Sequence, residues 1–389
     1  MNIDKVLLGT IASEICGRDF DVNSILSLSS EELKKLYDLA LMHDVAHIVG
    51  SAISKSGAAL SDKDGAELFS KEHMLAVFRY RRFSDELSNI STLFENEALS
   101  HIILKGSVLR DYYPEPWMRT SCDIDILVKP DDVERAGELL EKSLGYTLTA
   151  RTRHDVSYNS ATGVHLELHY TLIEDGVVGS EEKILGEVWE HTVLLDEKKY
   201  TRIMTDEMFY FYHIVHMAKH LISGGCGIKN ILDFWVLENR VPADFTAREK
   251  IISESGFLAF EEGVRRLSHI WFDGAPSDEV SETLGAFIIT GGVYGTVQNG
   301  VSIGVVKKQG RLRYALSRIF LPYSTMKNLY PTLRKHKNLL PFFHIRRWIR
   351  VIFKGGLKRA KAQFSKSGRI SETEIKDTAK ILEYLGLDV

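Results

Sequence analysis

The chain has 389 residues, more than the ~250 to 300 over which one hydrophobic core usually grows, so we expect two or more packed units. Its composition, 44% hydrophobic and 26% charged with 8 prolines, is typical of a soluble globular protein and excludes extensive disorder. The 3 cysteines lie far apart, which excludes a CxxC metal knuckle and a disulfide framework and favours a reducing cytoplasm. No basic leader and no apolar run of membrane-spanning length is evident, so no transmembrane segment is expected.

The net charge of −4 hides an uneven distribution of charged residues. Residues 307–369 contain 18 of the 49 Lys and Arg residues and no Asp or Glu. The rest of the chain therefore carries 31 basic residues against all 53 acidic ones. Such a basic segment either attracts an anionic partner, such as RNA, anionic lipid or a protein, or docks on the protein's own acidic part.

Residues 1–98 show helical patterns. Ser29-Ser30-Glu31-Glu32 has the form of a capping box, which predicts the start of a helix. The apolar residues that follow at three- and four-residue steps are expected on one face; they are Leu33, Leu36, Tyr37, Ala40 and Leu41. A longer helix is predicted over residues 66–96, which contain few helix breakers.

The pattern changes to strands at residue 101. Short β-rich runs bounded by turn residues predict strands over residues 102–105, 123–128, 151–160 and 164–170. Thr162-Gly163 supplies a hairpin-like connection between the last two. Residues 131–144 have helical spacing and end at Gly145, a natural C-terminal stop. A helix is also predicted over residues 108–112.

From Thr205 onward the chain returns to helical patterns, with a helix predicted over residues 228–238. Leu321-Pro322 and Leu340-Pro341 are expected to break the basic segment into short helices, and an acidic helix is expected near residues 372–385. We therefore predict an α+β fold. Its regions are an N-terminal helical region (1–98), a small mixed-sheet core (99–203), a second helical region (204–304) and a basic C-terminal helical region (305–389).

Three carboxylates are the first candidates for chemistry. Asp123 and Asp125 share one face of a strand because side chains alternate along it. By the same alternation, Glu167 lies on the polar face of a later strand. Like charges about 7 Å apart on a half-buried sheet are costly unless a cation neutralises them, and oxygen ligands of this kind suit Mg²⁺. The alternative is a set of solvated acids at a strand end.

Lys105-Gly106-Ser107 lies where a strand gives way to a predicted helix. Glycine lets the backbone approach an anion, serine offers a hydroxyl, and the first N–H groups of a helix attract negative charge. The segment is either a phosphate cradle or an ordinary turn.

His165 and His169 flank Glu167 on the same predicted strand face and could instead bind zinc. Positions i and i+4 of a strand diverge by about 13 Å, which is too far for one tetrahedral ion without other ligands. This distance argues against zinc, but a zinc hydrolase stays a third interpretation beside the enzyme and the inactive scaffold that are described below.

The order of these motifs resembles that of the polymerase-beta-like nucleotidyltransferase superfamily. A strand is followed by a Gly-Ser turn and a helix, then by a strand with Asp-x-Asp, and then by an acid on a later strand. Within it the chain resembles the bacterial family known as uncharacterised nucleotidyltransferases, over most of residues 30–355 and most densely over 101–170. The spacing from Ser107 to Asp123 exceeds the commonest gap of the wider superfamily but is similar to this family. The matching residues are Lys105-Gly106, Leu109, Tyr113-Pro114, Arg119, Asp123-Ile124-Asp125, Glu167-Leu168-His169, His216, Lys219-His220, Asp233, Tyr330-Pro331 and Leu340-Pro341.

The resemblance implies two-metal phosphoryl transfer, in which a nucleoside monophosphate passes from a nucleoside triphosphate such as ATP to an acceptor hydroxyl and pyrophosphate leaves. It implies two Mg²⁺ ions, with Mn²⁺ as a substitute, held by the catalytic residues Asp123, Asp125 and Glu167. Gly106 and Ser107 would bind phosphate oxygens. The acceptor is a small molecule, a protein side chain or an RNA end.

Further nucleotide-binding candidates come from the same resemblance. Lys105 and Arg119 would contact phosphates, or alternatively pair with a neighbouring acid. His216, Lys219 and His220 share one face of a predicted helix in the region that covers the nucleotide in similar proteins. Asp233 could pair with this cluster or cap and pack a helix.

Two other points remain open from the sequence. The alternative to an enzyme is a catalytically inactive scaffold that kept the fold. Such a scaffold would use its basic segment to bind RNA, anionic lipid or a protein partner, although the three retained carboxylates argue against it. In residues 345–353, Ile345, Trp348, Ile349 and Ile352 share one helical face beside arginines. That pattern is typical of a helix at a membrane surface or on nucleic acid, or of one packed on the protein itself.

Overall fold

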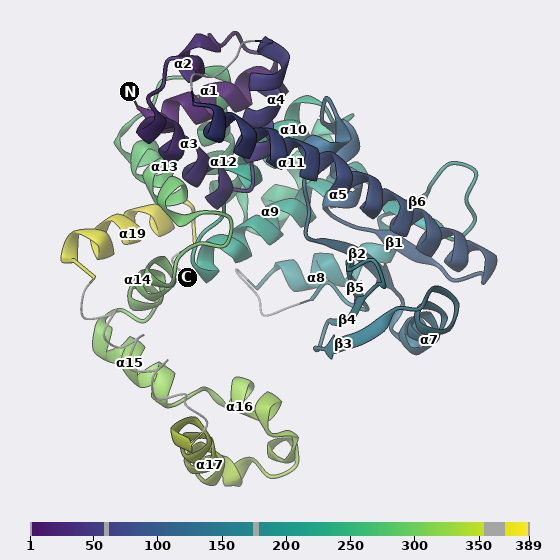
Figure 1. Cartoon of the computed structure of the whole chain (residues 1–389). Coiled ribbons are helices and arrows are strands. Elements are labelled where there is room, and N and C mark those ends of the chain that lie inside the picture. The colour runs from purple at the N-terminus through teal and green to yellow at the C-terminus, as the bar shows by residue number, and fades with distance from the viewer. Residues whose placement is uncertain (1, 58–61, 174–178, 354–369, 388–389) are drawn as a thin grey trace.

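The computed structural model describes residues 2–57, 62–173, 179–353 and 370–387. Figure 1 shows a bundle of helices drawn from both the N-terminal part and the second half of the chain, and a sheet to one side of it. An arm made of residues 311–353 projects from this body near the C-terminal end. The predicted α+β fold, with a mixed sheet between helical regions, is confirmed.

The N-terminal part is helical, as predicted. The capping box forms at Ser29, whose hydroxyl accepts from the Glu32 N–H while the Glu32 carboxylate accepts from the Ser29 N–H at 3.1 Å. Leu33 and Leu36 are buried, but Leu41 is exposed because it lies at the edge of the buried face near the helix end. The helices are α1 (Ile3–Cys16), α2 (Asn23–Leu26), α3 (Ser30–Met42), α4 (Ala46–Ser56) and α5 (Lys63–Asn96).

Helix α5 has 34 residues and runs from the bundle to the sheet (Figure 1). At 1.5 Å per residue it is about 51 Å long. Phe69 in its first half belongs to the large core of the bundle, whereas Phe83, Ile90 and Phe94 in its second half belong to a separate core beneath the sheet. One helix therefore supplies side chains to both cores.

The sheet is mixed, with the strand order β3-β4-β5-β2-β1-β7-β6. Its central strand is β2, which pairs in parallel with β5 on one side and antiparallel with β1 on the other. Strand β1 in turn is parallel to β7. The outer strands β3 and β4 continue from β5 as antiparallel neighbours. The strands are β1 (His101–Ile103), β2 (Asp123–Val128), β3 (Thr147–Arg151), β4 (Asp155–Asn159), β5 (His165–His169), β6 (Thr192–Leu194) and β7 (Thr201–Met204).

Three local differences from the sequence prediction occur around the sheet. The strand predicted over residues 151–160 is two strands, β3 and β4, that meet at a turn over 152–154. The helix predicted over 108–112 is a short α6 (Gly106–Leu109) followed by a 3-10 turn, η1 (Arg110–Tyr112). Strands β6 and β7 were not predicted, because each is too short to show a periodic pattern.

One face of the sheet packs on α7 (Val133–Leu144) and the second half of α5. Helix α7 ends at Gly145, whose positive φ of 69° closes the helix as predicted. The side chains of Ile124, Ile126 and Leu166 fill this core. Because side chains alternate, the opposite face of the same strands carries Asp123, Asp125 and Glu167.

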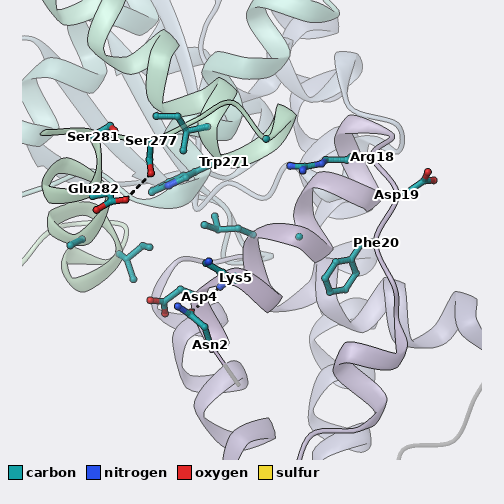
Figure 2. Close-up of a pocket in the computed structure, with 17 residues that line it drawn as sticks. Asn2, Asp4, Lys5, Arg18, Asp19, Phe20, Trp271, Ser277, Ser281 and Glu282 are labelled. Atoms are coloured by element: carbon teal, nitrogen blue, oxygen red, sulfur yellow. Dashed lines mark hydrogen bonds between the residues drawn. The ribbon is translucent and has the colours of Figure 1, made fainter. Parts of the chain in front are cut away.

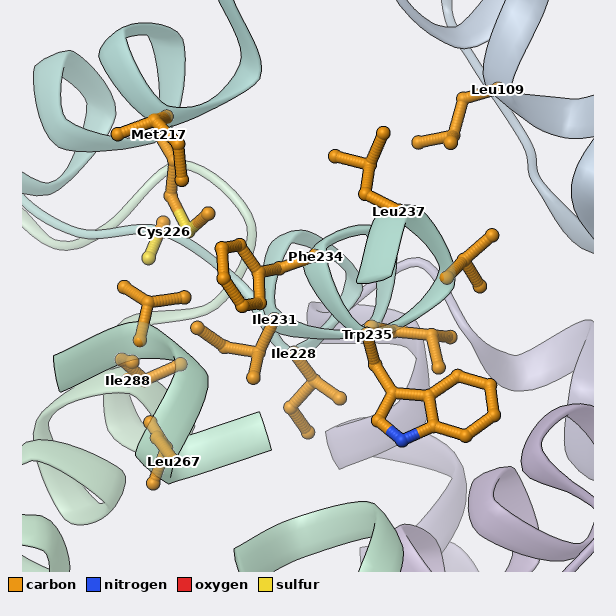
Figure 3. Packing of buried hydrophobic residues seen from close by; sticks show 14 of the residues in the cluster. Leu109, Met217, Cys226, Ile228, Ile231, Phe234, Trp235, Leu237, Leu267 and Ile288 are labelled. Atoms are coloured by element: carbon orange, nitrogen blue, oxygen red, sulfur yellow. The ribbon is translucent and has the colours of Figure 1, made fainter. Parts of the chain in front are cut away.

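The second helical region completes the bundle. Figure 3 shows α10 side chains, among them Ile231, Phe234 and Trp235, packed between neighbouring helices. Leu109, the last residue of α6, lies in the same core, which fixes the turn at Gly106 to the bundle. The helices are α8 (Glu181–Gly186), α9 (Asp206–Ser223), α10 (Ile228–Asn239), α11 (Phe245–Ser255), α12 (Leu258–Ser268) and α13 (Glu279–Gly291), with shorter turns η2 (Pro116–Met118), η3 (Pro130–Asp132), η4 (Val188–Glu190) and η5 (His269–Asp273).

The C-terminal region is a series of short helices, and the predicted breaks at Leu321-Pro322 and Leu340-Pro341 are confirmed. The predicted acidic helix is α19, which packs on α13 and α14. None of the described helices is both long enough and apolar enough to cross a membrane. The elements are α14 (Val297–Lys307), α15 (Arg311–Ile319), α16 (Tyr323–Leu329), η6 (Pro331–Arg334), η7 (Lys337–Leu339), α17 (Leu340–Phe353) and α19 (Glu372–Tyr384).

Candidate active site

The carboxylates of two neighbouring strands meet on the open face of the sheet. In the parallel register of β2 and β5, Asp125 lies opposite Glu167 and Asp123 lies opposite His165. Ligand atoms of Asp125, Glu167 and His169 all lie within 4.8 Å of one another. The strand alternation read from the sequence thus brings Asp125 and Glu167 to one place.

Asp125 is buried and has two nitrogen partners, Lys105 and His169. Lys105 Nζ and His169 Nε2 lie 2.8 Å and 2.9 Å from the same oxygen, Oδ1 of Asp125, and His169 Nε2 is also 3.4 Å from the Glu167 carboxylate. Burial alone would raise the pKa of Asp125, but Lys105 and His169 outweigh it and hold that pKa below its usual value. Burial lowers the pKa of His169, and its bonds to Asp125 and Glu167 raise it above its ordinary value overall. Asp125 is therefore ionised at neutral pH.

Asp123 is in a different state from Asp125. It makes no hydrogen bond or ion pair with any residue in the described part of the chain. Burial, and then the charges of Asp125 and Glu167, raise its pKa to about 6, although Lys105 works in the opposite direction. A half-buried carboxylate that repels its neighbours in this way is relieved when a cation binds between them.

Lys105 reaches Asp125 from an unusual backbone conformation. Its φ of 46° and ψ of −128° are values that favour glycine, and such a conformation costs about 1 to 3 kcal/mol in a residue with a side chain. The residue ends the segment after β1 and directly precedes Gly106 and α6. The surrounding packing of Leu104 and Leu109, both fully buried, holds the turn in place.

A sequence model of the family described as uncharacterised nucleotidyltransferase matches residues 29–273. The chain belongs to this family. The matched range holds the whole sheet with α9 and α10, and the resemblance read from residues 101–170 lies inside it. The further matches at Tyr330 and Leu340 lie outside it, as does the arm. No match is found among curated proteins.

In this member of the family, α9 brings Tyr212 and His216 close to Lys105 and Asp125. Tyr212 is buried against Lys105, and burial raises its pKa. His216 Nε2 and His220 Nε2 lie 2.9 Å apart. Burial, followed by the nearby charge of Lys105, lowers the pKa of both histidines, that of His220 to about 4, and burial also lowers the pKa of Lys219. The two histidines therefore face the site as neutral rings at pH 7.

Arg119 forms a buried ion pair with Asp233 of α10. Its Nε and Nη2 donate to the two carboxylate oxygens at 2.8 Å each, and the Tyr113 hydroxyl donates to the same carboxylate at 2.6 Å. A Cβ added to Gly106 would lie 3.0 Å from Arg119 Nη1, so the guanidinium lies directly beside the turn. Asp233 thus pairs with Arg119 rather than with the histidines of α9, and the pair ties the turn to the bundle.

The histidines of β5 have separate surroundings. His165 Nδ1 bonds to Asn159 at 2.9 Å and its Nε2 is 3.8 Å from Glu167, whereas His169 is the histidine that joins the Asp125 and Glu167 cluster. From the sequence, His169 was considered only as an alternative zinc ligand together with His165, and its contact with Asp125 was not predicted. The signal was present in the alternation that put it on the same face as Glu167, and its contact with Asp125 depends on the pairing of β2 with β5.

A cavity of about 680 Å³ lies apart from this site, between α1 and α13 (Figure 2). Its walls include Phe20 and Trp271, and Lys5, Arg18 and Glu282 also line it. None of the clustered carboxylates contributes to it. The cavity is therefore separate from the candidate active site.

Proposed function

We propose that this nucleotidyltransferase moves a nucleoside monophosphate from a nucleoside triphosphate to an acceptor hydroxyl, with release of pyrophosphate. The observation that carries the proposal is the pairing of Asp125 with Glu167 across two parallel strands beside Asp123, whose pKa is raised to about 6. Three acids gathered on one half-buried face fit a function that brings cations to them.

The donor set fits divalent metal ions. Carboxylate oxygens of Asp123, Asp125 and Glu167 are the ligands that Mg²⁺ and Mn²⁺ prefer, and the imidazole of His169 is a donor that Mn²⁺ accepts more readily than Mg²⁺. When bound, such ions neutralise phosphate charge and activate the attacking hydroxyl. We propose the three carboxylates as both metal-binding and catalytic residues.

Lys105, Gly106 and Ser107 are proposed to bind the triphosphate. Lys105 stays protonated, because the charge of Asp125 outweighs burial and raises its pKa. Its ammonium group neutralises Asp125 in the metal-free protein and becomes available to a phosphate oxygen once a metal ion takes over that role. Gly106 adds no side chain to the turn, which leaves its backbone accessible beside Ser107.

Residues of α9 are proposed to bind the nucleoside or its phosphates from the opposite side. His216 and His220 are neutral at pH 7, so they act by hydrogen bonding and stacking rather than by charge. Lys219 is the cation of this face. Arg119 acts on the nucleotide by fixing the turn at Gly106, since its guanidinium is held by Asp233.

The test is incubation of the full chain in cell extract with each α-labelled nucleoside triphosphate and Mg²⁺ or Mn²⁺. Label on RNA, protein or a small metabolite identifies the acceptor. Transfer should disappear in the double variant Asp123→Asn, Asp125→Asn and persist in Asp131→Asn, which removes an exposed acid just after β2. Undiminished transfer by the double variant would contradict the proposal.

A scaffold without catalysis is the second candidate. The observation that favours it is that Lys105 and His169 already satisfy Asp125 at hydrogen-bond distance. Thermal shift separates the two candidates. Stabilisation by nucleoside triphosphate that requires a divalent metal supports the enzyme, whereas no response to either ligand supports the scaffold.

A further inference from the structure

The arm is a folded unit with a core of its own. Met326, Leu333 and Phe343 are buried together, apart from the cores of the bundle and the sheet. Trp348 Nε1 donates to the Ile319 carbonyl at 3.0 Å and its ring packs on Phe320, which joins α17 to the end of α15. In Figure 1 the arm stands away from both the bundle and the sheet. Its outer surface is therefore fixed by its own packing.

Apolar side chains form exposed stripes on two helices of this arm. On α15, Leu312, Leu316 and Ile319 follow at steps of four and three residues and are 74%, 45% and 37% exposed. On α17 the stripe consists of Phe342, Ile345 and Ile349, which are 59%, 51% and 51% exposed. Spacings of three and four residues place each set on one helical face. Trp348 faces inward instead, and the side chain of Ile352 lies outside the described residues.

Arginines flank both stripes. Arg313 and Arg318 of α15 and Arg346 and Arg350 of α17 are exposed, and residues 307–353 contain no acid. Among the described residues, the basic side chains between 313 and 350 form no ion pair with a carboxylate. The described part of the basic segment beyond residue 312 is thus not docked on the protein's own acidic part, which was one of the two alternatives.

We propose that the arm binds the surface of an anionic membrane through these stripes and arginines. Insertion of apolar side chains at the lipid boundary together with attraction of basic residues to anionic headgroups is how amphipathic helices lie on a bilayer. RNA would engage the arginines but give the exposed Leu and Ile side chains no partner. A second copy of the arm would be repelled by its own charge. The proposal does not depend on the proposed transferase activity.

The test is co-sedimentation of the full chain with phosphatidylcholine vesicles that contain or lack phosphatidylserine. Binding is expected only with phosphatidylserine and should weaken as salt is raised, because headgroup attraction is screened. Equal binding to both kinds of vesicle, or no binding to either, would overturn the proposal.

Two sets of substitutions separate the contributions. Arg313→Gln, Arg318→Gln and Arg350→Gln together should weaken partitioning about 100-fold, at about fivefold for each basic residue near an anionic surface. Phe342→Ser, Ile345→Ser and Ile349→Ser should weaken it about tenfold or more, because apolar insertion is lost. All six residues are exposed, so circular dichroism should show unchanged folding.

The matched control replaces equally exposed apolar residues elsewhere, Met74→Ser and Phe245→Ser, which are 63% and 68% exposed. These variants should bind vesicles as the wild type does. Vesicle binding that is equally reduced by the control, or is unchanged by both arm variants, would refute the proposal. Two other results would also refute the proposal. One is tight RNA binding that the serine substitutions do not change, in a protein that does not bind vesicles. The other is a concentration-dependent dimer in solution that the serine substitutions convert to a monomer.

Discussion

Replacing Asp123 by Asn is expected to stabilise the metal-free protein at pH 8. Burial and the charges of Asp125 and Glu167 raise the pKa of Asp123 from 3.8 to about 6. A shift of that size corresponds to about 3 kcal/mol of unfavourable interaction once the carboxyl group is ionised. Because Asp123 shares its titration with neighbouring acids, we expect a gain of about 1 to 3 kcal/mol for the variant.

The sign of this effect sets its pH dependence. The pKa of Asp123 is raised in the folded protein. Its carboxyl group therefore leaves the free energy of unfolding undiminished below the unfolded pKa of Asp, and lowers that free energy as the pH rises through about 6. The advantage of Asn is therefore expected to be full at pH 8, to fall to about half at pH 5, and to approach zero only below about pH 4. With the usual unfolding entropy per residue, it amounts to an upward shift in Tm of about 1 to 4 °C for a chain of 389 residues.

Differential scanning calorimetry in the presence of EDTA measures this shift. Adding Mg²⁺ or Mn²⁺ at 100 times the dissociation constant should then stabilise the wild type by about 2.7 kcal/mol. This is a rise in Tm of about 3 °C, and the Asn variant should be nearly unchanged. Asp131→Asn serves as the control and should alter neither value. If the Asn variant is no more stable than the wild type in EDTA at pH 8, the reasoning that the clustered carboxylates repel each other is refuted.

Three other expected outcomes concern the bundle and the cover of the site. Asp233→Ala should cost about 3 to 5 kcal/mol in chemical denaturation, because it leaves the Arg119 guanidinium buried and unpaired; a loss below 1 kcal/mol would show that the pair is solvated. Phe69→Ala should cost about 3 to 5 kcal/mol through the cavity it leaves, against under about 1 kcal/mol for the exposed Phe78→Ala on the same helix, and equal losses would contradict the assigned core. Lys219→Met should weaken nucleoside triphosphate binding about tenfold in calorimetric titration with little change in Tm, whereas unchanged affinity would remove Lys219 from the binding face.

The carboxylate cluster could be predicted from the sequence as far as strand alternation reaches. Asp123, Asp125 and Glu167 were expected on one face because a two-residue period is a local property of each strand. The parallel pairing of β2 with β5, which places Asp125 opposite Glu167, joins residues 42 positions apart in the chain. Neither strand's own sequence predicts this pairing. The contact of His169 with Asp125 follows from that register and was therefore not predicted.

The fold was predictable where a pattern is long and local, and less so elsewhere. The capping box at Ser29 and the long helix over residues 66–96 both carry strong signals, and both are confirmed. Strands β6 and β7 have three and four residues and owe their existence to pairing with the sheet. The positive φ of Lys105 arises from packing on both sides of the turn, which no propensity scale represents.

The length of α5 has a consequence for any attempt to isolate the sheet. A fragment that starts at residue 99 would lose Phe83, Ile90 and Phe94, which fill the underside of the strands. Ile124 and Leu166 would then face water, and the two strands that carry the acids on their opposite face would lose their support. We expect such an excised piece to aggregate, so catalytic residues and the preceding helix have to be produced together.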